Sequence, residues 1–213
     1  MRTAEKNRKI YIVISQTGTI LSRILKFITG AKYNHASISL SPDLSIMYSF
    51  GRRHPYNPFW GGFVTESPDT GTFRRFSETR AVVLAITVRE DQYMAIQERI
   101  DAMLEMKEAY HYNYLGLGLA AFNVRYRRSR HYYCSEFVRD LLAKSDVTGC
   151  RALAPIVQPI HFLEMWKCRR FTRFSGAGCA ITPFPYSVYR AHAGRNSQAK
   201  NFRLSFSFHP DGA

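Results

Sequence analysis

The chain has 213 residues, 46% of them hydrophobic, which is enough to bury the core of one domain, with or without an extension. Its formal net charge of +14 predicts attraction to anionic partners: nucleic acid, an anionic membrane or an acidic polymer. No apolar run reaches the roughly 18 residues of a membrane-spanning helix, and the N-terminus lacks a full signal-peptide core, so we expect a cytoplasmic protein.

The N-terminal half is predicted to form strands, interrupted by one amphipathic helix. Apolar runs rich in β-branched residues, or alternating with polar ones, predict strands at 9–15, 33–40, 46–50, 63–66 and 81–88. Residues 20–28 carry an apolar stripe of helical period, with Arg23 and Lys26 outside it. Such a helix packs on its own sheet or, being basic, lies on a membrane.

The C-terminal half is predicted to be mainly helical. Helical spacing predicts helices at 92–106, at 110–121, after Cys134 and at 161–167, with a last strand at 171–174. The periodicity then fades, so we predict one domain at 1–176 and a poorly ordered extension at 177–213. The predicted fold class is α+β, with an antiparallel sheet of about five or six strands packed against helices.

A cysteine stands at the start of the third of these helices. Apolar residues recur at helical spacing from Phe137 to Leu142, and Ser135 and Glu136 favour the first turn. The free N–H groups and the positive end of the helix dipole favour the thiolate form of Cys134, which is the nucleophilic form. The alternative is a small buried residue that packs beneath the helix.

A cysteine nucleophile needs a base, commonly a histidine, which a third polar group orients. Among the seven histidines, His35 lies within a predicted strand, a rigid element that can hold an imidazole against a helix end. The alternative for His35 is a half-buried side chain satisfied by a backbone carbonyl. The four cysteines show no C-x-x-C pair and no metal-ligand spacing, so no disulfide framework, metal or other cofactor is predicted.

Two short segments together resemble a known superfamily. Residues 34–38 (N-H-A-S-I) and 133–138 (Y-C-S-E-F-V) are similar to the His strand and the Cys helix of the circularly permuted NlpC-like, papain-like branch. That branch includes YiiX-like bacterial proteins and the lecithin retinol acyltransferase relatives. In its permuted order the histidine precedes the cysteine, as it does here. The resemblance covers residues 9–176 and implies a papain-like core.

The resemblance implies a catalytic role for each matching residue. Cys134 would be the nucleophile and His35 the base. The third polar residue of the superfamily lies on the strand after the His strand, where Ser49 is the matching position. Serine orients an imidazole weakly and adds no charge, so Tyr48 and Glu66 are possible substitutes.

The resemblance also implies how an oxyanion would be stabilised. Tyr133 matches a tyrosine that is frequent before the nucleophile and would shape the oxyanion site. The helix N–H groups beside Cys134, including that of Ser135, would supply the hydrogen-bond donors.

Three functions are compatible with this resemblance. The first is a thiol hydrolase of the cysteine peptidase or amidase type, acting on an amide or ester; the basic composition is compatible with an anionic substrate. The second is a membrane-associated acyltransferase of the lecithin retinol acyltransferase type, with lipid contacts from Arg23, Lys26 and the run at Leu115. The third is a non-catalytic binding module. The basic cluster from Arg125 to Arg130 has no recognised nucleic-acid motif beside it, so no specific nucleic acid is predicted.

Overall fold

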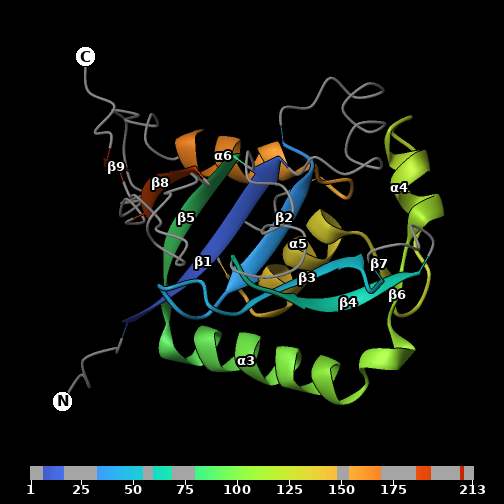
Figure 1. The fold of residues 1–213 in the computed structure, drawn as a ribbon, viewed down its shortest axis with the longest axis horizontal. Coiled ribbons are helices and arrows are strands. Elements are labelled where there is room, and N and C mark those ends of the chain that lie inside the picture. Colours follow the sequence, from blue (N-terminus) through green and yellow to red (C-terminus); the bar gives the residue numbers. More distant parts are fainter. Residues whose placement is uncertain are drawn as a thin grey trace, which may run out of the picture.

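A mainly antiparallel sheet forms the centre of the computed structural model (Figure 1). The structure describes residues 7–16, 33–54, 60–68, 80–147, 154–168, 186–192 and 207–208. The hydrogen-bonded strand order is β7-β6-β4-β3-β2-β1-β5-β8-β9. The strands are β1 (Asn7–Gln16), β2 (His35–Ser39), β3 (Met47–Arg52), β4 (Gly61–Glu66), β5 (Arg80–Arg89), β6 (His111–Tyr112), β7 (His131–Tyr132), β8 (Tyr186–His192) and β9 (Ser207–Phe208).

Helices cover the sheet and extend beyond it. They are α3 (Glu90–Glu105), α4 (Tyr114–Ala120), α5 (Cys134–Lys144) and α6 (Pro159–Cys168), with a 3-10 turn η1 (Lys107–Ala109). Helix α5 packs on β2 and β3, and α3 packs on β1 and β5. In Figure 1, α4 stands at the right edge, away from the central strands. None of the described helices has the length and apolar character needed to cross a membrane.

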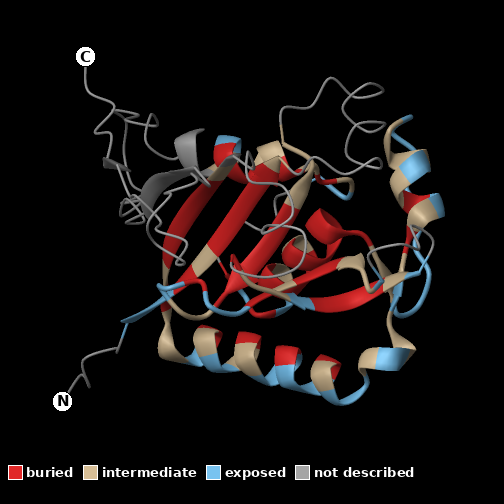
Figure 2. Cartoon of the chain, viewed as in Figure 1, coloured by how far each residue is buried: buried red, intermediate tan, exposed pale blue. Residues whose placement is uncertain are grey.

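The hydrophobic core lies between the sheet and α5, and it appears as the red interior of Figure 2. Strand alternation places Ile10, Ile12 and Ile14 on one face of β1, and all three are fully buried. From α5, the ring of Phe137 lies 5.3 Å from that of Phe50 and 5.6 Å from that of Phe63, measured between centroids. Burial of these rings joins the helix firmly to the sheet.

The α+β class predicted from the sequence is confirmed, and the five strands expected in the first half correspond to β1–β5. The expected number of strands was too low. Strands β6 and β7 are each two residues long, too short to leave an alternating pattern in the sequence, and they pair in parallel. Helix α4 begins only at Tyr114 because residues 111–112 form β6.

The segment predicted to be a poorly ordered extension also contributes strands. Strand β8 pairs antiparallel with β5 from Tyr186 to His192, and β9 pairs with β8. Its sequence Y-S-V-Y-R-A-H contains the aromatic and β-branched residues that favour strands. These strands add to the sheet, while the division into a domain at 1–176 and an extension at 177–213 stays a prediction. The helix predicted at 20–28, with Arg23 and Lys26, and the strand predicted at 171–174 lie outside the described residues.

Candidate active site

Cys134 is the first residue of α5. Tyr133 occupies the N-cap position in an extended conformation and provides no side-chain hydrogen bond to the helix. The N–H groups of the first turn are therefore left for other acceptors. Cys134 is only 4% exposed, and its sulfur lies 3.9 Å from the carbonyl oxygen of Asn34. The start of the helix thus meets the start of β2.

His35 opens β2, and a carboxylate holds its ring. Its Nε2 lies 3.0 Å from Oε1 and 2.9 Å from Oε2 of Glu66, the last residue of β4. The hydroxyl of Ser37 donates to Oε2 of Glu66 at 3.0 Å and fixes the carboxylate in turn. Both partners are largely buried, with side chains 13% and 16% exposed. Because Nε2 faces Glu66, Nδ1 is the nitrogen left for the thiol.

His35 and Cys134 shift each other's ionisation. Burial alone lowers the pKa of His35, but the charge of Glu66 and the hydrogen bond with Cys134 outweigh it and raise that pKa well above its ordinary value. Burial likewise raises the pKa of Cys134, but the hydrogen bond and charge of His35, with N–H groups of Ala36 and Ser135, lower it. These opposite shifts favour a thiolate–imidazolium pair.

Tyr112 is a member of the site that sequence reasoning missed. Burial raises the pKa of its hydroxyl, and the charge of Cys134 and a hydrogen bond to Cys134 raise it further. Gly61 allows Tyr112 to lie close against β4, since a Cβ at position 61 would lie 2.8 Å from the Cβ of Tyr112. Tyr112 stands on a two-residue strand, and no local pattern in the sequence relates it to Cys134.

The structure does not bring Ser49 or Tyr48 to the imidazole. The hydroxyl of Ser49 donates to the carbonyl of Ala36 at 2.7 Å, a bond between neighbouring strands. The ring of Tyr48 stacks on Phe63 with centroids 6.2 Å apart. Of the residues named for the third polar group, Ser49 and Tyr48 therefore do not contact the imidazole in the structure, and Glu66, which was named only as a substitute, does. The Ser49 hydroxyl lies against the backbone of β2, and the side chain on the His35 ring is that of Glu66.

Tyr133 and Ser135 both contact the segment that precedes α6. The Ser135 hydroxyl donates to the carbonyl of Val157 at 2.5 Å. Burial raises the pKa of Tyr133, and the backbone N–H of Val157 bonds its hydroxyl and opposes that rise. These side chains therefore brace the start of α5, while the N–H of Ser135 faces the sulfur.

Comparison with family models finds no match for this chain, and comparisons with curated proteins and with solved structures find none either. Within the part of the chain that the structure describes, no group of three or more His, Cys, Asp or Glu side chains could hold a metal ion. The arrangement of Cys134, His35, Glu66 and Tyr112 is thus the main guide to function.

Replacing Glu66 with glutamine should lower the pKa of His35, because the amide keeps a hydrogen bond but removes the negative charge. NMR titration of 15N-labelled imidazole signals measures this directly. Because the folded-state pKa of His35 is raised, its protonation stabilises the fold below the ordinary histidine pKa, and this contribution is lost as pH rises through the folded pKa. Glu66→Gln should therefore reduce the free energy of unfolding most in acidic buffer.

The matched control is Glu164→Gln, which removes one carboxylate from an exposed position on α6. This variant should leave the titration of His35 unchanged. An unchanged His35 titration in Glu66→Gln itself would contradict the assigned contact.

Proposed function

We propose that the protein is a thiol hydrolase that cleaves an amide or ester bond through an acyl-enzyme on Cys134. The observation that carries the proposal is the contact of both Glu66 carboxylate oxygens with Nε2 of His35, beside a cysteine at a helix N-terminus. A nucleophile, a base and a carboxylate that orients the base are the three parts of a catalytic triad. The papain-like arrangement, in which the Cys helix packs on the sheet that carries the histidine, belongs to the same proposal.

In the first half-reaction, the Cys134 thiolate attacks the carbonyl carbon of the substrate. The oxyanion that forms lies near the first-turn N–H groups of α5, which have no side-chain cap. The bond to the leaving group then breaks, and the His35 imidazolium gives its proton to that group. Glu66 keeps the ring in place and stabilises its positive charge.

In the second half-reaction, water attacks the thioester. Neutral His35 takes a proton from the water as the new carbon–oxygen bond forms. The carbon–sulfur bond breaks, the carboxylic acid leaves, and the thiolate is restored beside the imidazolium. The hydrogen bond between Tyr112 and Cys134 favours the anionic sulfur that starts and ends the cycle.

An acyltransferase is the second candidate, since an acceptor other than water could attack the same thioester. The observation that favours it is an exposed apolar surface beside the site, on α4 and the segment that follows. A non-catalytic binding module is less well supported, because both partners of the imidazole are in place.

The proposal can be tested by intact-mass measurement after incubation with p-nitrophenyl acyl esters. The wild-type protein should gain one acyl group, mapped to Cys134, and Cys134→Ala should gain none. Adding an amine acceptor would reveal transferase activity as an acylated amine. Equal acylation of Cys150, Cys168 and Cys179 would show that no thiol is activated and would overturn the proposal.

A further inference from the structure

Residues 113–130, termed here the α4 arm, project from the end of the molecule beside the active site. The arm contains α4 and the segment that leads to β7, and it is largely pale blue in Figure 2. Several large apolar side chains lie open to solvent on it: Leu115 is 55% exposed, Phe122 is 75% exposed and Val124 is 48% exposed. Burying such side chains in a partner removes apolar area from water and is favourable.

The arm is also strongly basic. No Asp or Glu occurs between Glu108 and Glu136, whereas four arginines lie in that interval, all within exposed positions. Within the described part of the chain, Arg125, Arg128 and Arg130 form no ion pair. Their charge is therefore available to an anionic partner. Apolar and basic side chains that share one exposed segment are typical of a protein surface that lies on anionic lipid.

The base of the arm is held in place by strand pairing and by buried polar contacts. Strands β6 and β7 pair in parallel below it. The Asn113 side chain accepts from the Gly116 N–H at 2.9 Å and donates to the Tyr126 carbonyl at 3.0 Å, which joins the start of the arm to the segment that follows α4.

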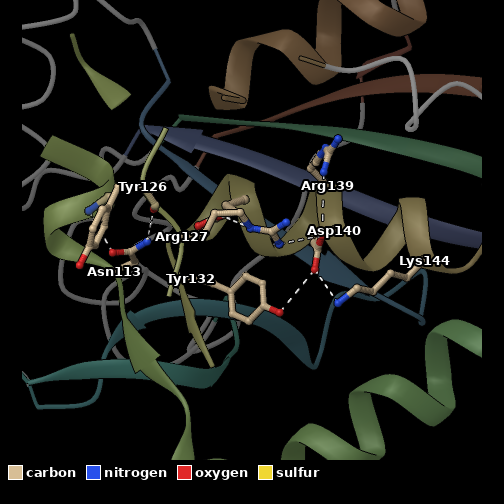
Figure 3. A network of polar contacts seen from close by, with 9 residues as sticks. Asn113, Tyr126, Arg127, Tyr132, Arg139, Asp140 and Lys144 are labelled. Carbon is tan, nitrogen blue, oxygen red and sulfur yellow. Dashed lines mark hydrogen bonds and ion pairs between the residues drawn. The ribbon is translucent and has the colours of Figure 1, made fainter. Parts of the chain in front are cut away.

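Arg127 differs from the other arginines because it turns inward. It lies 3.3 Å from Glu136 and 3.1 Å from Asp140, whose carboxylates are 6% and 9% exposed. Figure 3 shows this arginine reaching α5, where Asp140 also meets Tyr132 and Lys144. Asn113 and Arg127 thus join the arm to its base and to α5, and its apolar side chains are exposed in this arrangement.

We propose that the α4 arm docks on an anionic membrane surface, with Leu115, Phe122 and Val124 in the acyl-chain boundary and the outer arginines at the headgroups. A nucleic acid would bind the arginines and could stack a base on Phe122, but it would gain nothing from the aliphatic Leu115 and Val124, which only a membrane would bury. Tyr112 and Cys134 lie at the base of the arm, so docking would bring the site to the lipid surface. This inference concerns an interaction surface and does not require the proposed chemistry.

Co-sedimentation with lipid vesicles tests the proposal, using phosphatidylcholine mixed with phosphatidylserine or phosphatidylcholine alone. The 213-residue chain should bind the mixed vesicles and bind the neutral ones far more weakly. The variant Arg125→Gln/Arg128→Gln/Arg130→Gln should lose on the order of 100-fold in affinity. The variant Leu115→Ser/Phe122→Ser/Val124→Ser should lose roughly tenfold or more.

Matched controls distinguish vesicle binding through the arm from binding that exposed charged or apolar side chains elsewhere on the protein would give. Arg8→Gln/Lys9→Gln/Arg99→Gln removes the same charge from exposed positions elsewhere, and Met94→Ser/Met106→Ser removes exposed apolar side chains from α3 and its end. Both should bind the mixed vesicles within about twofold of wild type if the arm carries the affinity. Cys134→Ala should bind like wild type, so failure of the acyl chemistry would not affect this test.

Two results would overturn the docking proposal. One is that the variant Leu115→Ser/Phe122→Ser/Val124→Ser binds the mixed vesicles with wild-type affinity. Vesicle binding would then come from electrostatic attraction alone. The other is absence of vesicle binding by wild type together with tight, arginine-dependent binding of a fluorescent oligonucleotide, which would assign the arm to nucleic acid.

Discussion

Exchange of His35 for asparagine should slow acyl transfer to Cys134 by roughly 10²–10⁴, the usual contribution of a general acid–base group. Asparagine is close in size to the imidazole, but it can neither carry a proton nor stabilise the thiolate by charge. The rate is measured as the initial release of p-nitrophenolate from an acyl ester. The variant's rate should rise with pH through the ordinary thiol range of about 8.5. Wild type should already react at lower pH, because the pKa of Cys134 is lowered.

The pH profile distinguishes a catalytic role of His35 from a structural one. A mutation that merely disturbed the fold would lower the rate at every pH without moving the profile. The control is His54→Asn at an exposed position, which should keep both rate and profile. Wild-type kinetics in His35→Asn would remove the histidine from the mechanism.

Truncation of Phe137 to alanine should cost about 3–5 kcal/mol of the free energy of unfolding, the usual range for a phenylalanine removed from a packed core. Phe137 is 2% exposed and packs against both Phe50 and Phe63. The cavity would lie in the contact between α5 and the sheet. Urea unfolding followed by far-ultraviolet circular dichroism measures the change as a lower midpoint.

Phe122→Ala is the matched control for this truncation, because the same side chain is removed from a position that is 75% exposed. Its unfolding midpoint should stay close to that of wild type, since surface substitutions usually change stability by less than about 0.5 kcal/mol. Equal midpoints for the two variants would contradict the assignment of Phe137 to the core.

Much of the sheet could be predicted from the sequence because each main strand carries its own pattern. The β-branched runs of β1 and β5 are buried centrally, and such continuous apolar runs are visible in the sequence without any partner. Strands β6 and β7 are only two residues long, so they depend on pairing with residues distant in the chain. Strand β8 was missed because it lies among residues that show no pattern around it.

The candidate site was predictable only in part, for a similar reason. Cys134 and His35 each stand at the start of a regular element, which the sequence marks by its periodicity. The third group depends on how strands are placed across the sheet. Ser49 was favoured because β3 follows β2 in the chain, yet the carboxylate that reaches His35 comes from β4. Tyr112 depends on tertiary contact alone.

If Cys134 is the proposed nucleophile, the separation of the site between the two halves of the chain affects when its thiol becomes reactive. Ribosomal synthesis delivers His35 and Glu66, on β2 and β4, before it delivers Cys134. Until α5 docks on the sheet, Cys134 is an ordinary thiol that is only slightly ionised at neutral pH. On that proposal, a nascent or misfolded chain would carry no activated Cys134 that could modify its neighbours. In a cell extract, rapid labelling of Cys134 would count the correctly folded molecules rather than the total amount of protein.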